Sequence, residues 1–199
     1  MPKEIYLLRH GQTEFNLERR MQGHCDSPLT ELGESQARAM GATLGELLSD
    51  PSEWQVLVSP LGRAQQTAKL LMNELGLPAS HLHIDPRLIE VAFGDWEKQQ
   101  VMTLFAKYPD LAEQADWYFN APGCEQLADV TSRLTQWLSD PKLPPRIIVV
   151  AHGLLGRILR GLYAGMSPQA MWQQDMPQDA FFYLKDGALT RIECVQYAD

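Results

Sequence analysis

The sequence predicts an α/β protein with three layers, α/β/α, whose mostly parallel central sheet carries a small helical cap insertion. Two observations predict this class. Short apolar runs alternate with amphipathic helical patterns, which is typical of parallel strands covered by helices on both faces. A hairpin pattern near the end of the chain adds antiparallel strands to the sheet.

The first half of the chain contains two strand-helix pairs. Residues 4–8, EIYLL, predict a short buried strand. A helix is predicted to begin after Thr30, a residue type preferred at helix N-caps. Residues 54–60, WQVLVSP, predict the second strand, and residues 61–76 predict an amphipathic helix that a glycine stops.

The second half repeats the alternation and ends in the hairpin. Residues 82–88, LHIDPRL, predict a third and weaker strand, whereas residues 146–153, RIIVVAHG, are the strongest strand signal in the chain. Residues 154–165 follow as a helix. Residues 180–195 predict two strands joined by an Asp-Gly turn.

Residues 98–126 break the alternation, and we interpret them as a helical excursion that forms a cap. The whole chain, residues 1–199, is then expected to form one domain. The alternative is a surface helical pair with no role in binding. The segment mixes aromatic residues, prolines and lysines: Lys98, Lys107, Tyr108, Pro109, Trp117, Tyr118, Phe119 and Pro122.

Net charge, the length of the apolar runs and the cysteine spacing indicate the cellular compartment and the classes of partner. The net charge of −8 argues against a general surface for nucleic acid or anionic membrane. The first apolar run is too short for a secretory signal, and no run approaches the length of a membrane span. Cys25, Cys124 and Cys194 are far apart and match neither a disulfide framework nor a zinc site. We therefore expect a cytoplasmic protein, and the sequence leaves its oligomeric state open, a homodimer included.

Polar side chains and glycines follow four predicted strands at the point where each strand ends. Because the carboxyl ends of parallel strands meet at one edge of a sheet, we expect these residues to share one cavity. A lone histidine there is more often structural, and a lone arginine or glutamate is usually solvated, so the joint placement carries the inference. The residues are Arg9, His10 and Gly11, then Arg63, then Glu90, and finally His152 and Gly153.

These residue types suit the transfer of a phosphoryl group. Guanidiniums grip phosphate oxygens, the glycines allow a close backbone approach to the ligand, and the helix after Gly153 directs its N–H groups at an anion. A neutral histidine can attack phosphorus, while a second, protonated histidine stabilises the transferring oxygens. A carboxylic acid can protonate the leaving alkoxide. This chemistry needs no metal and no organic cofactor.

Four motifs in this order, LLRHGQTEFN, SPLGRAQQTA, E…FGDWE and VVAHG, resemble the histidine phosphatase superfamily, formerly called the phosphoglycerate mutase-like family. The resemblance runs from residue 5 to about residue 165. It implies a phosphohistidine on His10 and proton donation by Glu90. It also implies a phosphate pocket formed by Arg9, His10, Asn16, Arg63 and His152. Gln22 and Gly23 are implied to border the substrate.

The substrate side departs from the family pattern at two places. Lys98 stands where relatives often have glycine after GxWE, and residues 122–126, PGCEQ, stand where relatives often have PGGES. Neither departure touches the implied phosphate pocket.

The charge of the cap favours a phosphatase over a mutase. A mutase must hold a second anionic group, and phosphoglycerate mutases of this family are longer, with paired arginines in the insertion. Between residues 98 and 132 this chain offers Lys98 and Lys107 against Asp110, Glu113, Asp116, Glu125 and Asp129. We therefore expect hydrolysis of a small-molecule phosphomonoester, and the compact length and GDWE look most like α-ribazole phosphatases. A cofactor-dependent phosphoglycerate mutase is the alternative.

Two other classes fit the sequence less well. A protein phosphohistidine phosphatase would have a shorter chain and an open site, against which the 98–126 excursion argues. A non-catalytic binding module would usually lose His10, Glu90 or His152, and the sequence retains all three.

Overall fold

The computed structural model describes residues 4–195, in which one sheet has the strands β1 (Glu4–Arg9), β2 (Gln55–Val58), β3 (Leu82–Ile84), β4 (Arg146–Ala151), β5 (Ala180–Lys185) and β6 (Ala188–Glu193). Their order is β3-β2-β4-β1-β5-β6. β1, β4, β2 and β3 pair in parallel, whereas β5 and β6 are antiparallel. The sheet is therefore mostly parallel, as predicted. Residues 1–3 and 196–199 of the expected domain lie outside the described residues. The first group is also part of the N-terminal segment in which no secretory signal is expected.

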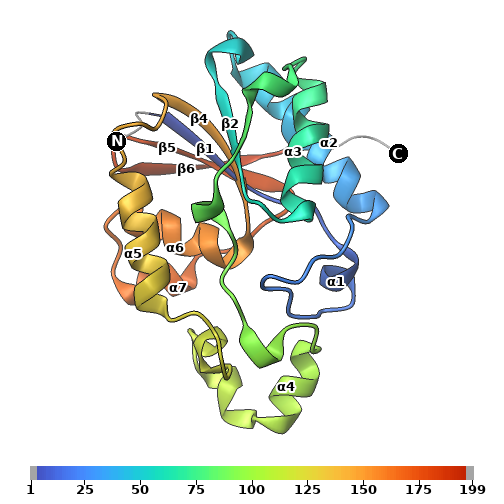
Figure 1. Cartoon of the computed structure of the whole chain (residues 1–199), viewed down its shortest axis with the longest axis vertical. Helices are drawn as coiled ribbons and strands as arrows, with labels where there is room; N and C mark the ends of the chain where they lie inside the picture. Colours follow the sequence, from blue (N-terminus) through green and yellow to red (C-terminus); the bar gives the residue numbers. More distant parts are fainter. Residues whose placement is uncertain (1–3, 196–199) are drawn as a thin grey trace.

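Helices cover both faces of the sheet, which confirms the three predicted layers (Figure 1). One face carries α2 (Glu31–Leu47) and α3 (Gly62–Glu74). The other face carries α5 (Leu127–Leu138) and α6 (Gly153–Tyr163), with the short α7 (Pro168–Gln173) packed on α6.

The strand β1 supplies apolar side chains to both cores. Ile5 and Leu7 join the core beneath α5 and α6, whereas Tyr6 and Leu8 join the core beneath α2 and α3. Successive residues of a strand point to opposite faces. A run of consecutive apolar residues is therefore what a strand buried on both faces requires.

Local signals place the ends of these elements. The Thr30 side chain accepts a hydrogen bond from the Gly33 N–H and caps α2. The chain leaves α3 through Gly76, whose φ is +65°. The hairpin turn has positive φ at both Asp186 and Gly187, as the tight two-residue turn between twisted strands requires.

The structure adds three helices that the sequence analysis did not predict, and it shortens one strand. The added helices are α1 (Glu14–Leu17), α5 and α7. The third strand ends at Ile84 instead of running to Leu88, because Pro86 lacks the N–H of a strand residue and begins a 3₁₀ turn over Pro86–Leu88.

Residues 98–126 form a helical segment, as predicted, that lies beyond the carboxyl ends of the strands (Figure 1). It contains α4 (Val101–Lys107) and two 3₁₀ turns, Pro109–Glu113 and Trp117–Asn120. Its aromatic rings pack on the preceding loop. Ring centroids lie 4.3 Å apart for Trp117 and Tyr118 and 6.0 Å apart for Tyr118 and Phe93.

Within residues 4–195, no helix combines the length and the apolar character that crossing a membrane requires.

Candidate active site

The carboxyl ends of the parallel strands border a cavity of about 110 Å³. Most of the residues that the sequence analysis singled out meet there, as the parallel sheet requires. His152 does not line this cavity, but its ring lies next to that of His10, with centroids 5.3 Å apart. The lining residues are Arg9, His10, Asn16, Arg20, Met21, Gln22, Gly23, Arg63, Glu90, Phe93, Tyr118, Gly153, Leu154 and Met176.

Hydrogen bonds at both ring nitrogens hold His10 in one orientation and one tautomer. Its Nδ1 donates a hydrogen bond of 2.8 Å to the Gly11 carbonyl, so Nε2 carries the lone pair. The Arg63 Nε–H donates a hydrogen bond of 3.2 Å to this Nε2, a bond that must give way before the lone pair can attack phosphorus. Burial lowers the pKa of His10 well below its usual range, and the charges of Arg63 and Arg9 add to the effect. The imidazole is therefore neutral, as nucleophilic attack requires.

The lowered pKa predicts where activity is lost in acid. A proton on Nε2 would remove the attacking lone pair, and His10 takes that proton only well below the usual histidine pKa of about 6.5. We expect kcat/KM, corrected for ionisation of the substrate phosphate, to persist as the pH falls through 6.5 and to decline only below it. A pH-rate profile with an aryl phosphate checks this, and an enzyme inflection at or above 6.5 would contradict it.

His152 differs from the protonated histidine that the sequence analysis expected. Burial lowers the pKa of His152 well below its usual range, with Arg63, His10 and Arg9 as further positive neighbours. The ring is therefore neutral in this structure. Its Nε2 lies 2.6 Å from the Ser59 Oγ. The Ser59 Oγ accepts a bond from the Leu61 N–H, so its own hydroxyl proton can be donated to Nε2 of His152. Nε2 is then the acceptor, and the neutral ring carries its proton on Nδ1.

Arg63 is buried and is oriented by a residue that the sequence analysis missed. Only 2% of its surface is exposed. Its guanidinium donates to the Cys25 and Gly23 carbonyls and to the Asp26 carboxylate. Asp26 also accepts from the backbone N–H groups of Gly62 and Arg63. One carboxylate thus caps α3, which has no cap of its own, and orients the arginine in the first turn of that helix.

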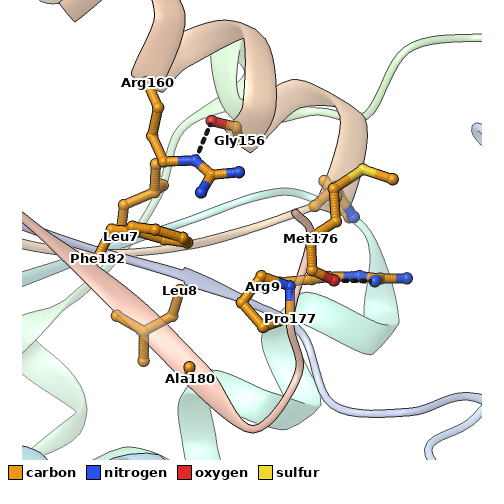
Figure 2. Close-up of a pocket in the computed structure, with 11 residues that line it drawn as sticks. Leu7, Leu8, Arg9, Gly156, Arg160, Met176, Pro177, Ala180 and Phe182 are labelled. Atoms are coloured by element: carbon orange, nitrogen blue, oxygen red, sulfur yellow. Dashed lines mark hydrogen bonds between the residues drawn. The ribbon is translucent and has the colours of Figure 1, made fainter. Parts of the chain in front are cut away.

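Arg9 lies against the beginning of α6 and keeps donors free. Figure 2 shows its guanidinium donating to the Met176 carbonyl, at 2.6 Å. Among the described residues, nothing accepts a bond from its buried Nε. A Cβ on Gly153 would lie 3.2 Å from that Nε. Gly153 therefore makes room for Arg9. It also lines the cavity, so its backbone lies beside the space expected to hold the ligand.

Glu90 occupies the position that the sequence analysis gave to a substrate anion. Its carboxylate accepts bonds from the N–H groups of Leu154 and Leu155 in the first turn of α6 and from its own neighbour Val91. Glu90 is buried, and these amides satisfy its oxygens. Its backbone carbonyl is in turn bonded to His24 Nε2 at 2.9 Å.

Gly11 does not line the cavity, contrary to the expected close approach to the ligand. A Cβ at Gly11 would lie 2.1 Å from the carbonyl oxygen of Gly33 in α2. The glycine therefore serves the packing of the loop after β1 on that helix. Its N–H donates to the Thr67 hydroxyl in α3.

Gln22 and Gly23, which the family resemblance implies as the substrate border, both line the cavity. Gln22 accepts a bond from Ser27. Gly23 has a φ of +54°, and a Cβ there would meet the Glu97 carboxylate at 2.2 Å, so the position admits only glycine.

The remaining cavity wall is apolar except for one cation. Phe93 and Tyr118 stack at one side, and Met21, Leu154 and Met176 complete the wall. Arg20 is the one cationic side chain here besides Arg9 and Arg63, among the residues that the structure describes. This wall suits an apolar or ring-bearing group attached to the phosphate.

Comparisons with known proteins agree with this geometry. The chain is 34% identical over 175 residues to adenosylcobalamin/alpha-ribazole phosphatase of Escherichia coli strain K12, covering 84% of this chain and 82% of that protein. It is 35% identical over 166 residues to probable phosphoglycerate mutase GpmB of Enterobacter sp. strain 638, covering 76% and 70%. The solved structure of a mycobacterial glucosyl-3-phosphoglycerate phosphatase with VO3 superposes with a TM-score of 0.74 at 30% identity, covering 99% and 100%.

The family resemblance seen in the motifs is confirmed by a family model that spans nearly the whole chain. The model matches residues 5–186 and is described as histidine phosphatase superfamily, branch 1. The strand ends that carry Arg9, His10, Arg63, Glu90 and His152 all fall inside this span. The chain belongs to the histidine phosphatase superfamily.

Proposed function

We propose that the protein is a phosphomonoesterase that hydrolyses a small-molecule phosphate ester through a phosphohistidine on His10. One observation carries this proposal: the neutral Nε2 of His10 faces a cavity that also holds Arg9, Arg63 and Glu90. The alpha-ribazole and glucosyl-3-phosphoglycerate phosphatases among its relatives support a phosphoric monoester hydrolase.

The reaction proceeds in two displacements. Arg9 and Arg63, with the amide of Asn16, bind the phosphate oxygens and place phosphorus in front of His10. His10 Nε2 forms the P–N bond while the P–O bond to the leaving group breaks. The Glu90 carboxylate takes the proton of the bound phosphate monoanion and passes it to the departing alkoxide. Water then attacks the phosphohistidine, Glu90 takes a proton from that water, and phosphate leaves with His10 regenerated.

We infer that His152, which lies beside His10 but outside the cavity lining, stabilises charge on the transferring oxygens when phosphate is bound. Its neutral ring is buried beside His10, and its Nδ1 finds no acceptor among the described residues. A phosphate in the cavity supplies the negative charge that favours an N–H donor there.

The apolar wall points to a leaving group with a ring or an apolar body. Tyr118 and Phe93 offer aromatic faces, and α-ribazole phosphate is one ester of this kind. Arg20 allows at most a single further anionic contact, whereas Lys98 and Lys107 do not line the cavity.

A second candidate is a phosphoglycerate mutase, because relatives named as probable mutases are equally similar.

The same proposal covers compartment and partners. We place the protein in the cytoplasm, because its three cysteines are all free. Its partner is the phosphate ester, with no nucleic acid and no membrane, given the net charge of −8. Self-association as a homodimer stays open to measurement.

A metabolite panel tests the function. We expect phosphate release from aryl phosphates and α-ribazole phosphate to exceed that from glycerol phosphate, because the latter offers no ring to the apolar wall. Excess EDTA should leave the rate unchanged, since arginines supply the positive charge. With 3-phosphoglycerate primed by 2,3-bisphosphoglycerate, formation of 2-phosphoglycerate faster than phosphate release would favour the mutase, and activity restored only by added metal would contradict the mechanism.

A further inference from the structure

Gln178 is a polar residue outside the expected site that reaches two members of it. It lies just before β5, and its side chain crosses to the loop after β1. Its Nε2 donates one hydrogen bond of 3.0 Å to the His10 carbonyl and one of 3.1 Å to the Asn16 Oδ1. No motif in the sequence marks this residue.

The chemistry of the partners fixes the orientation of both amides. A backbone carbonyl only accepts hydrogen bonds, so the His10 oxygen requires the NH₂ group of Gln178 to face it. The second N–H of that group then requires the oxygen of Asn16. The Thr13 N–H also donates to Asn16 Oδ1, at 3.2 Å. With its oxygen held by two donors, Asn16 has its Nδ2 left to face the cavity that it lines.

We propose that Gln178 is a positioning residue that keeps the N–H groups of Asn16 directed at the phosphate; this rests on the proposed function. The two ends of the Asn16 amide have nearly the same shape and opposite polarity. A reversed amide would present its oxygen to the anion and repel it. Gln178, together with the Thr13 N–H, therefore determines which end of the Asn16 amide faces the phosphate, without touching the substrate.

The segment around Gln178 does not depend on this residue for its place. The Asp175 carbonyl accepts a bond from Arg160. The Met176 carbonyl accepts one from Arg9, as Figure 2 shows. Arg160 is itself buried and lies over the Phe182 ring, 3.7 Å from its centroid. Substitutions at Gln178 therefore test its hydrogen bond to the Asn16 amide and not the attachment of the segment that precedes β5.

The decisive variant is Gln178→Glu, which has the same shape but only acceptor atoms when ionised. Its oxygens would face the oxygens of His10 and Asn16, and rotation of the Asn16 amide relieves that repulsion. We expect the Kd for orthovanadate, measured by calorimetry, and the KM for an aryl phosphate to rise roughly 10–100-fold. kcat should change little, because the Asn16 contact is present in both ground and transition states.

Two further variants separate orientation from general damage. Gln178→Leu removes the donor but leaves the Thr13 N–H on Asn16, so we expect a smaller rise of roughly three- to tenfold. Gln173→Glu changes an exposed glutamine of α7 by the same charge and should leave Kd and KM within about twofold. In an Asn16→Ala background, both Gln178 changes should add less than about twofold, because the group they orient is gone.

The outcomes distinguish this inference from the proposed function. Unchanged vanadate binding in Gln178→Glu, or an equal effect with and without Asn16, would overturn the positioning role. If Gln178→Glu does not fold, Gln178→Leu in both backgrounds decides by the same criterion. Vanadate binding that weakens as expected in a protein that hydrolyses no ester would uphold the role of Gln178 and reject the phosphatase.

Discussion

His10→Ala is expected to lower kcat/KM by roughly 10⁴–10⁶-fold, the size of effect that follows loss of a nucleophile. The remaining residues still bind the phosphate, but no atom is left to form the P–N bond. The rate of phosphate release from an aryl phosphate measures the loss. Rapid quenching of the wild-type protein during turnover should show phosphate on His10 in an acid-labile bond, and the variant should show none.

His83 provides a matched control for this change. It lies in β3, where its exposed ring bonds to the Gln55 side chain, and His83→Ala should keep activity within about twofold. Full activity in His10→Ala, or a phosphorylated residue other than His10, would remove the nucleophile from this position.

Glu90→Gln is expected to separate substrates by the basicity of their leaving groups. An alkyl phosphate needs a proton on its departing oxygen, so its kcat/KM should fall roughly 10²–10⁴-fold, the usual contribution of general acid catalysis. p-Nitrophenyl phosphate releases a stable anion, so its formation of phosphohistidine should slow far less. Burst kinetics with the two substrates measure the first displacement directly.

The Glu90→Gln experiment has a matched control elsewhere in the chain. Glu113→Gln makes the same change on an exposed residue of the cap and should slow neither substrate. The amide retains the shape of the carboxyl, but it can accept from the N–H groups of α6 with one oxygen only. The difference between the two substrates, and not the absolute loss of rate, therefore reports the proton. Equal losses on alkyl and aryl phosphates would exclude Glu90 as the acid.

The residues at the strand ends could be predicted because their positions follow from local patterns. Apolar runs locate the strands, and a parallel sheet brings their carboxyl ends to one edge. Arg9, His10 and His152 come directly after such runs, and Arg63 opens the following helix. The order of four motifs then identified the family without any coordinates.

The residues that support the site could not be predicted, because their partners are distant in the sequence. Asp26 caps a helix that begins 36 residues later, Ser59 meets His152 across 93 residues, and Gln178 reaches Asn16 across 162. Each is a common polar type whose role depends on what lies opposite. Ser59 falls within a quoted motif, SPLGRAQQTA, and no quoted motif contains Asp26.

Tertiary structure also changed two chemical assignments. The N–H groups at the beginning of α6 bond to Glu90 instead of facing a substrate anion. Burial leaves His152 neutral where a protonated ring was expected. Neither result follows from residue types, because both depend on how far water is excluded from the site.

The sequence by itself determined the layered α/β architecture, the edge of the sheet where the cavity lies and most of the polar residues that line that cavity. These properties depend on apolar periodicity and on chain direction, which are local. Only the tertiary structure decided which way the amide of Asn16 faces, which carboxylate orients Arg63 and which histidine is neutral. Hydrogen-bond direction and protonation are set by all the groups that surround a side chain, and folding alone brings those groups together.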